Sequence, residues 1–224
     1  MRCIKSFFLF AALLLAISAC TDAMYTELDI YYLDLGMAAR NGDTLCFLMD
    51  DSTWLYPENS NLDNEIVSGK RYNIHYRLLE HNSGQKKKER YKAEVLDLRE
   101  VPILPIEYKV KDVNSLLALQ HIRVDRIWLG GGFLNISYHG LMHTDSNELQ
   151  RIQLITQSAS SNDIQLRFYH FKSNQQNNEK PQRSDFFLSF PLKDMLDYKP
   201  QKTIKLSVYE TGGWTTYYIT SQIR

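Results

Sequence analysis

The stretch Asp125-Arg126-Ile127-Trp128-Leu129-Gly130-Gly131-Gly132-Phe133-Leu134-Asn135-Ile136 decides the fold of the second half of the chain. Apolar residues lie on both sides of three glycines, which tolerate the backbone conformations that tight turns need. We therefore predict two strands, 122–129 and 133–138, joined by a hairpin turn. A phosphate-binding loop would need a helix after the glycines. A strand follows here, so the glycines predict a turn.

Five more short strands are predicted after this hairpin. They occupy 149–156, 163–171, 185–190, 203–209 and 215–220. Seven short strands separated by turn signals, such as Gly212-Gly213 before the last one, are typical of an antiparallel β-sandwich. Residues 111–120 have the spacing of a short helix. Residues 174–180 contain no apolar side chain and are predicted to form a solvated loop.

The first half of the chain is also predicted to consist of strands. They occupy 30–35, 44–50, 53–56, 71–80 and 90–98. Polar and apolar residues alternate with period two in 72–78 and 91–98, which places one face of each strand on a core. Asp50-Asp51-Ser52 predicts a tight turn whose two carboxylates point apart into solvent. Residues 81–84 predict a hairpin loop between the last two strands.

Pro102 and Pro105 mark the boundary between the two halves. Proline lacks a backbone N–H and resists both helices and central strands. We therefore predict an all-β protein with a first domain at 29–101 and a β-sandwich domain at 107–224.

The start of the chain has the layout of a secretory signal peptide. A basic region with Arg2 and Lys5 precedes the apolar run 7–17 and the small residues before Cys20. The run is too short to span a bilayer. It resembles the lipobox of bacterial lipoproteins, which implies a signal peptide at 1–19, a lipid on Cys20 that attaches the protein to a membrane, and a lipidated tether at 20–28.

Charge and cysteine content narrow the class of protein. Removal of 1–19 leaves 24 basic and 26 acidic residues. A chain without a basic excess lacks the main source of non-specific nucleic-acid affinity, so no nucleic-acid partner is expected. The cluster Lys86-Lys87-Lys88 is predicted to be a solvated hairpin tip. Cys46 would be the only free thiol, and its apolar neighbours predict a buried, unreactive side chain.

Several further segments carry a resemblance to a known family. The segment 125–136, together with Leu166-Arg167-Phe168-Tyr169-His170, Phe186-Phe187-Leu188-Ser189-Phe190, Trp54-Leu55-Tyr56-Pro57 and Gly69-Lys70-Arg71-Tyr72, resembles the pattern of NigD-like lipoproteins. The resemblance implies a five-stranded, OB-like barrel followed by a β-sandwich. The family name is tied to a bacteriocin operon, for which an immunity role has been suggested, and the family offers no catalytic residues to carry over.

The resemblance also bears on localisation. It implies a lipid-anchored protein of the cell envelope, at the outer membrane. Family members often carry a run of aspartates after the acylated cysteine, whereas this chain has Thr21-Asp22-Ala23. The sequence therefore leaves open whether the protein faces the periplasm or the cell surface.

Candidate catalytic and metal-binding residues were sought among histidines, carboxylates and hydroxyls. His139 and His143 lie near Asp145, but a turn after a strand does not form a helical ligand pair, and neither His-Glu-x-x-His nor Cys-x-x-Cys is present. The chain also lacks Gly-x-Ser-x-Gly. We predict no metal, no cofactor and no catalytic residue.

Exposed aromatic side chains are the remaining candidates for binding. Trp128 and Trp214 flank glycine-rich turns, where they form either an exposed contact patch at one end of the sandwich or part of its core. On an OB-like barrel, aromatic residues could offer stacking surfaces. These are Tyr31, Tyr32, Trp54, Tyr72 and Tyr76.

The expected function follows from the anchor and the two β-domains. We expect a non-enzymatic, membrane-anchored lipoprotein that binds or assists another envelope component. The alternatives are an immunity or stress-protection lipoprotein acting against a bacteriocin or antimicrobial peptide, and a glycan-binding module.

Overall fold

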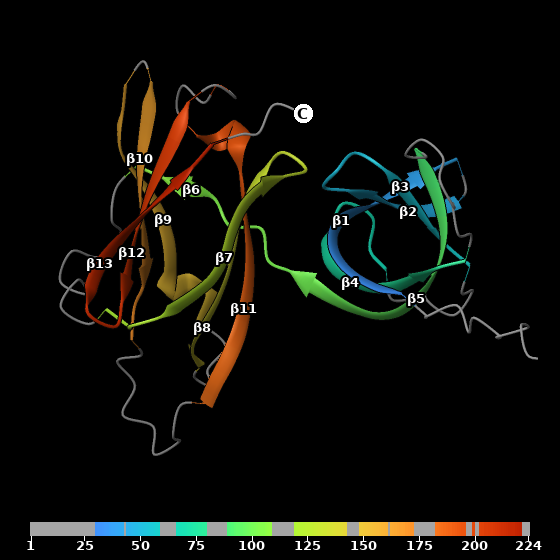
Figure 1. The fold of residues 1–224 in the computed structure, drawn as a ribbon, viewed down its shortest axis with the longest axis horizontal. Coiled ribbons are helices and arrows are strands. Elements are labelled where there is room, and N and C mark those ends of the chain that lie inside the picture. Colours follow the sequence, from blue (N-terminus) through green and yellow to red (C-terminus); the bar gives the residue numbers. More distant parts are fainter. Residues whose placement is uncertain are drawn as a thin grey trace, which may run out of the picture. The chain divides into compact units, whose positions relative to one another are not determined.

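The described part of the protein consists of a closed five-stranded barrel and two further sheets (Figure 1). The structure is a computed structural model. It describes residues 30–42, 44–58, 66–79, 89–108, 119–142, 148–160, 162–172, 182–195, 199 and 202–220. No helix in these ranges is long and apolar enough to cross a membrane. The predicted all-β class is confirmed.

The barrel confirms the predicted OB-like architecture. Its strands are β1 (Tyr31–Asn41), β2 (Thr44–Met49), β3 (Trp54–Pro57), β4 (Arg71–Leu78) and β5 (Arg90–Val101). They follow the order β1-β2-β3-β5-β4, and β1 also pairs with β4 to close the barrel. The β3–β5 pair is parallel and the others are antiparallel.

The period-two alternation places the barrel core where it was predicted. On β4, the buried residues Tyr72, Ile74 and Tyr76 point inward with Phe47 of β2 and Val95 of β5. Cys46 is fully buried, as predicted. Its Sγ lies 3.5 Å from the carbonyl oxygen of Ala39, and burial raises the pKa of the thiol. The predicted turn between β2 and β3 is confirmed, with Ser52 at φ 69°.

The β-sandwich is confirmed as the second part of the fold. Its strands are β6 (Ile106–Glu107), β7 (Arg123–Gly130), β8 (Phe133–Met142), β9 (Ile152–Ala159), β10 (Asp163–His170), β11 (Gln182–Pro191), β12 (Thr203–Glu210) and β13 (Gly213–Ile219). One sheet has the order β13-β12-β10-β9-β6 and the other has the order β11-β8-β7. The 3₁₀ turns Glu148–Arg151 and Leu192–Asp194 precede β9 and follow β11.

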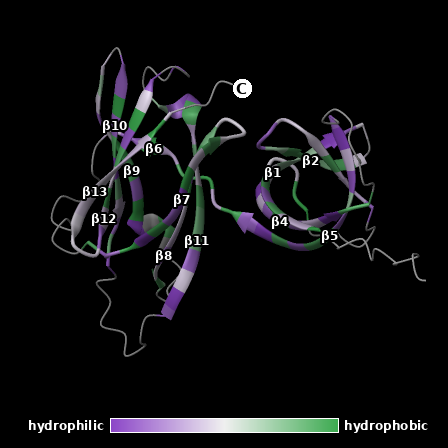
Figure 2. Ribbon diagram, in the orientation of Figure 1, coloured by the Kyte–Doolittle hydropathy of each residue, from purple (hydrophilic) through white to green (hydrophobic). Residues whose placement is uncertain are grey.

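Two details of the sandwich differ from the expectation. The β10–β12 and β6–β9 pairs are parallel. In each case the chain crosses to the other sheet between the two strands, through β11 for the first pair and through β7 and β8 for the second. The two-residue strand β6 was not predicted, because it directly follows Pro105 and is too short to show an alternation of polar and apolar residues. In Figure 2, β11 changes from hydrophilic at its start to hydrophobic toward its end, where it joins the sandwich core.

The glycine turns lie where they were predicted. Gly131 and Gly132 have φ values of 58° and 83° between β7 and β8, and Gly212 has φ 115° between β12 and β13. The β4–β5 pairing is antiparallel, and its connection, which includes Lys86-Lys87-Lys88, lies outside the described residues.

Several other predictions also concern residues that the structure does not describe. These are the signal peptide, Cys20 and the tether, most of the predicted helix 111–120, and the loop 174–180. Of the predicted helix, Leu119 and Gln120 are described, and Leu119 forms an isolated antiparallel bridge with Phe171.

The segment between the two prolines pairs with the sandwich. Ser189 of β11 donates its N–H to the carbonyl of Pro102 (3.1 Å) and accepts from the N–H of Leu104 (3.0 Å). Ile103 thereby forms a parallel bridge with Ser189. The predicted domain junction is thus tied to β11 by backbone hydrogen bonds.

Candidate functional site

Arg71 is a charged side chain that is almost completely buried. It is the first residue of β4, and its side chain is 1% exposed. Its Nε donates to Ser189 Oγ (2.8 Å), and its Nη2 donates to Asp50 Oδ1 (2.5 Å) and Asn135 Oδ1 (3.1 Å). Its Cζ lies 4.5 Å from the centre of the Phe133 ring. A guanidinium can remain charged at such depth because its donors are matched by acceptors.

Asp50 is the acidic partner of Arg71, and the sandwich also binds it. Its Oδ2 accepts from Trp128 Nε1 and Asn135 Nδ2, both at 3.3 Å. Ser189 Oγ donates to Asn135 Oδ1 (2.8 Å) and completes the network. We call the five residues Asp50, Arg71, Trp128, Asn135 and Ser189 the clasp, because barrel side chains meet sandwich side chains there.

The glycines of the β7–β8 hairpin allow this close approach. A Cβ on Gly130 would lie 2.5 Å from Asp50 Oδ2, and one on Gly131 would lie 2.5 Å from Asp50 Oδ1. The N–H of Gly131 also donates to the backbone carbonyl of Asp50 (3.2 Å). The glycines therefore do more than turn the chain, because they leave room for the carboxylate.

The clasp corrects the prediction that Asp50 is solvated. Its side chain is 17% exposed and lies against Arg71 and Trp128. Burial raises the pKa of the Asp50 carboxyl above its ordinary value, although the Arg71 guanidinium acts in the opposite direction. The two adjacent carboxylates have different hydrogen-bond partners. Asp51 accepts from the hydroxyl of Thr53 at 2.6 Å.

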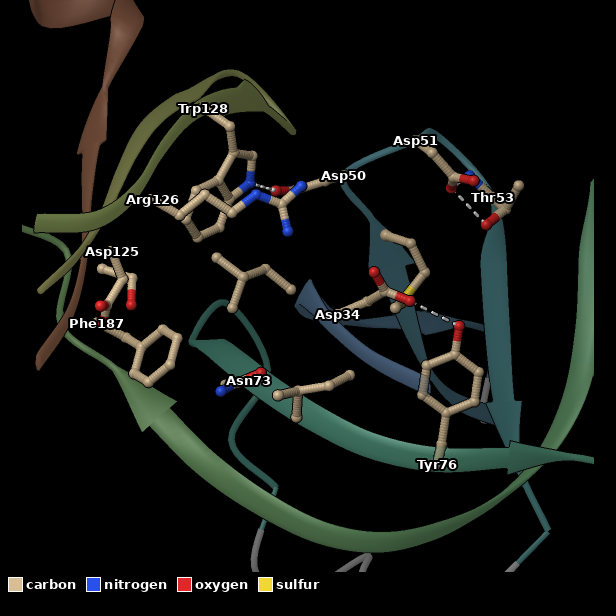
Figure 3. A pocket seen from close by; sticks show the side chains of 14 residues that line it. Asp34, Asp50, Asp51, Thr53, Asn73, Tyr76, Asp125, Arg126, Trp128 and Phe187 are labelled. Carbon is tan, nitrogen blue, oxygen red and sulfur yellow. Dashed lines mark hydrogen bonds between the residues drawn. The ribbon is translucent and has the colours of Figure 1, made fainter. Parts of the chain in front are cut away.

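A cleft of about 420 Å³ opens beside the clasp (Figure 3). Four carboxylates line it, from Asp34, Asp50, Asp51 and Asp125, with one guanidinium, from Arg126. Apolar side chains lie between the charges. They belong to Leu33, Leu35, Met49, Trp128 and Phe187. Barrel and sandwich residues both contribute to this lining.

Hydrogen bonds and ring contacts hold the polar groups of the cleft. Tyr76 donates its hydroxyl to Asp34 Oδ2 (3.0 Å), and burial together with Asp34 raises the pKa of Tyr76. The Arg126 Cζ lies 4.8 Å from the centre of the Trp128 ring, where a cation is attracted by the ring face. The cleft therefore combines negative charge with an aromatic face that already accepts a guanidinium.

His139 lies between two carboxylates. Its Nε2 is 2.8 Å from Asp125 Oδ2, and its Nδ1 is 2.5 Å from Asp185 Oδ1. The carboxylates approach opposite ring nitrogens and do not converge on one point. Within the described ranges, no group of three or more histidine, cysteine or acidic residues could hold a metal ion. His143 and Asp145 lie outside those ranges.

The structure places the predicted aromatic residues in different surroundings. Trp128 is half-buried in the clasp, whereas Trp214 is 43% exposed on the other sheet, against Tyr169 and Tyr209. Trp128 contacts Asp50 and Arg126, so among the described residues the two tryptophans share no ring-contact or hydrogen-bond partner.

The stacking surface predicted for the barrel is wrong in part. Tyr72 and Tyr76 are buried because they belong to the inward face of β4. The exposed aromatic residue of that group is Tyr31, while Tyr32 and Trp54 are half-buried.

The region that contains the sandwich residues of the clasp also identifies the family of the chain. The family model for the NigD-like C-terminal beta sandwich domain matches residues 104–221, more than half of the chain. The chain belongs to the NigD-like family. The matched range contains Trp128, Asn135 and Ser189, so the NigD-like domain provides three of the five clasp residues.

Solved structures share the fold of this NigD-like chain. A candidate toxin-related protein from Parabacteroides distasonis is 17% identical, with a TM-score of 0.65 over 86% of this chain and 95% of that chain. A NigD-like immunity protein from Bacteroides caccae is 18% identical, with a TM-score of 0.52 over 87% and 93%.

A candidate lipoprotein from Bacteroides fragilis is 12% identical, with a TM-score of 0.58 over 86% of this chain and 99% of that chain. At these identities the likeness shows the fold alone. No curated protein matches the chain.

Proposed function

We propose that this NigD-like chain is a non-enzymatic, lipid-anchored protein of the bacterial envelope that binds a positively charged polypeptide segment of another envelope component in its cleft. The observation that carries the proposal is the lining of the cleft, with four carboxylates, one guanidinium and apolar side chains between them. Arg71 pairs with Asp50 from outside the lining, so the excess of negative charge is smaller than the number of carboxylates. Pockets of a few hundred Å³ with an apolar lining and a few fixed polar groups are typical binding sites.

The charges of the cleft favour a cationic ligand. Asp34 accepts a hydrogen bond from the neutral hydroxyl of Tyr76, which does not offset its charge. Leu33, beside it on β1, is 60% exposed and lines the same cleft. A segment that carries a lysine or arginine next to an apolar side chain would match both residues. The site therefore suits part of a polypeptide better than a neutral small molecule.

The chemistry of the lining favours binding over catalysis. Asp50 is held by Arg71, Trp128 and Asn135, and Thr53 donates its hydroxyl to Asp51. Both oxygens of Asp50 already accept hydrogen bonds from these structural donors, which leaves less capacity to accept a proton from a substrate. The same contacts make the cleft a rigid surface, which lowers the entropic cost of binding.

Binding in the cleft is tested by reversing the charge of one residue. The full chain is immobilised and exposed to envelope extracts at increasing salt. Asp34→Lys should release a partner that the unchanged protein retains at low salt, whereas Asp97→Lys, which changes an exposed carboxylate of β5 outside the cleft lining, should not. Equal retention by both variants, or no retained partner at any salt, would contradict the proposal.

The anchor belongs to the same proposal and has its own test. Its support is the lipobox at Cys20, together with the fold shared with a candidate lipoprotein. Labelled palmitate should enter the unchanged protein and not Cys20→Ala. Protease added to whole cells then distinguishes the two faces of the outer membrane, because a surface protein is degraded and a periplasmic one is spared. Absence of label from the unchanged protein would remove the anchor.

Immunity is a second candidate function, and the acidic cleft is the observation that favours it. The Bacteroides caccae protein that shares this fold is a NigD-like immunity protein. A cleft that accepts cationic, apolar segments could intercept a cationic antimicrobial peptide at the envelope. Deletion of the gene should then sensitise cells, and the wild-type gene, but not Asp34→Lys, should restore protection. An unchanged killing curve would exclude this role.

A further inference from the structure

The outer face of the five-stranded sheet carries a pattern that the cleft does not use. On β12, Ile204, Leu206 and Val208 point into the sandwich core, so Lys205, Ser207 and Tyr209 point outward. On β13, which pairs with β12, the matching outward residues are Tyr218, Thr216 and Trp214. No aliphatic side chain occupies these six positions.

The register arranges the six side chains in rows across the two strands. Trp214 pairs with Tyr209, Thr216 with Ser207, and Tyr218 with Lys205. An aromatic pair thus lies at one end and a single tyrosine at the other, with two hydroxyls between them. Trp214 is 43% exposed and Tyr218 is 71% exposed. They lie four positions apart on an extended strand, a distance of about 14 Å, which exceeds the width of one sugar ring.

The polar row retains capacity to bind a ligand. Ser207 Oγ and Thr216 Oγ1 lie 3.1 Å apart and share one hydrogen bond. That bond uses one of the two hydroxyl hydrogens, so the other can donate to a ligand. In the neighbouring strand β10, Arg167 lies opposite Ser207, and its Cζ is 4.7 Å from the centre of the Trp214 ring. Its Nε is buried and has no hydrogen-bond acceptor among the described residues, so it is not counted among the groups open to a ligand.

We propose that this face, centred on Trp214, Thr216 and Tyr218, binds a polysaccharide chain. A sugar ring presents an apolar C–H face that packs on an aromatic ring, and its hydroxyls bond with serine, threonine and arginine. The two exposed aromatic rings with hydroxyls between them match that alternation. Protein interfaces are also enriched in aromatic residues and arginine, but they are depleted of lysine and serine, and Lys205 and Ser207 lie within this face.

The proposed surface is separate from the cleft. None of the outward residues of β12 and β13 lines the cleft, and Trp214 contacts Tyr169, Tyr209 and Arg167, which do not line it either. Polysaccharide binding can therefore succeed or fail independently of the function proposed for the cleft.

Native affinity electrophoresis tests the proposal. The full chain, solubilised in non-ionic detergent, is run in gels that contain xylan, yeast α-mannan or polygalacturonate. We expect at least one polysaccharide to retard the unchanged protein. Trp214→Ala and Tyr218→Ala should each weaken the apparent dissociation constant about tenfold, which corresponds to roughly 1.4 kcal/mol. Trp214→Phe, which keeps a stacking ring, should retain part of the binding.

The controls separate binding from folding and from self-association. Tyr31→Ala removes an exposed aromatic ring from the barrel and should bind like the unchanged protein. Tyr218 is so exposed that its replacement should leave the near-ultraviolet circular dichroism of the sandwich intact. The proposal is overturned if no polysaccharide retards the unchanged protein, or if both variants are retarded as strongly as it is. It is also overturned if light scattering shows a dimer that Trp214→Ala dissociates.

Discussion

At the scale of single residues, Arg71 explains why distant parts of the sequence meet. Its partners Asp50, Asn135 and Ser189 lie 21, 64 and 118 residues away along the chain. The local alternation of polar and apolar residues predicted a strand beginning at Arg71. Such local patterns carry no information about side-chain hydrogen bonds between residues so far apart in the chain. An arginine at the start of a strand is usually solvated, so the sequence offered no reason to bury it. The asparagine within the apolar run 133–138 was a usable signal, because a buried amide needs a partner.

Removal of the buried guanidinium should destabilise the fold strongly. Arg71→Met keeps much of the side-chain volume but leaves Asp50 buried without its cation. We expect the free energy of unfolding at pH 7 to fall by about 3–5 kcal/mol, the usual cost of breaking a buried ion pair. Urea denaturation at pH 7 measures this fall in the free energy of unfolding. Lys70→Met, which changes an exposed pair with Glu100, should cost less than about 1 kcal/mol. Equal losses in the two variants would contradict the clasp.

The loss in Arg71→Met should depend on pH. Burial already raises the pKa of the Asp50 carboxyl, and Arg71 opposes that rise, so its removal should raise this pKa further. A raised pKa in the folded state gives stability that is present at low pH and lost as pH rises through that pKa. The difference in unfolding free energy between Arg71→Met and the unchanged protein should therefore shrink from pH 7 to pH 4.5. If the difference in unfolding free energy grew between pH 7 and pH 4.5, the prediction would be wrong.

The space beside Asp50 gives a second prediction at this scale. In Gly130→Ala, the new methyl group would meet the Asp50 carboxylate, which Arg71 holds in place. We expect a loss of about 1–3 kcal/mol in unfolding free energy, as for other overpacked sites. Gly132→Ala has no atom within 4 Å of its Cβ and should cost only the roughly 1 kcal/mol of its positive φ. Thermal unfolding compares the two, and a smaller loss for Gly130→Ala would be inconsistent with this packing.

At the scale of elements, the sequence predicted most strands, because alternation in β4 and β5 and glycines after β7 and β12 are local signals. It did not predict the parallel pairings, which depend on the strands that cross to the other sheet, β11 for β10–β12 and β7 with β8 for β6–β9. Nor did it predict that the segment between the two prolines would pair with β11. Pro102 and Pro105 lack backbone N–H groups, but the N–H of Leu104 between them remains available to donate.

The pairing of this segment should be visible in amide hydrogen exchange. The N–H groups of Leu104 and Ser189 donate to backbone carbonyls across the bridge, whereas the N–H of Ile103 donates to no backbone carbonyl within the described part of the chain. We expect Leu104 and Ser189 to exchange slowly and Ile103 to exchange at least about tenfold faster, because exchange requires the hydrogen bond to open. Exchange rates from nuclear magnetic resonance test this. Equal rates for Leu104 and Ile103 would mean that the segment does not pair.

At the scale of the whole molecule, the clasp and the cleft share residues. Asp50 and Trp128 belong to both, so the network that joins barrel to sandwich also shapes one wall of the proposed binding site. The candidate site could be predicted from sequence only in pieces, since Trp128 was named as either a contact residue or a core residue and its partner Asp50 was expected to be solvated. The cleft is formed by both domains, and sequence patterns within one domain do not reveal it.

Site-specific photo-crosslinking tests the central claim, that this cleft holds a partner, most directly. A photoreactive amino acid replaces Leu33 in the cleft lining or, as a control, the exposed Leu96 of β5. Irradiation of living cells should yield a discrete adduct from position 33 that is absent from position 96 and is lost when Asp34→Lys is added. No adduct from position 33, or the same adducts from both positions with and without Asp34→Lys, would contradict the claim.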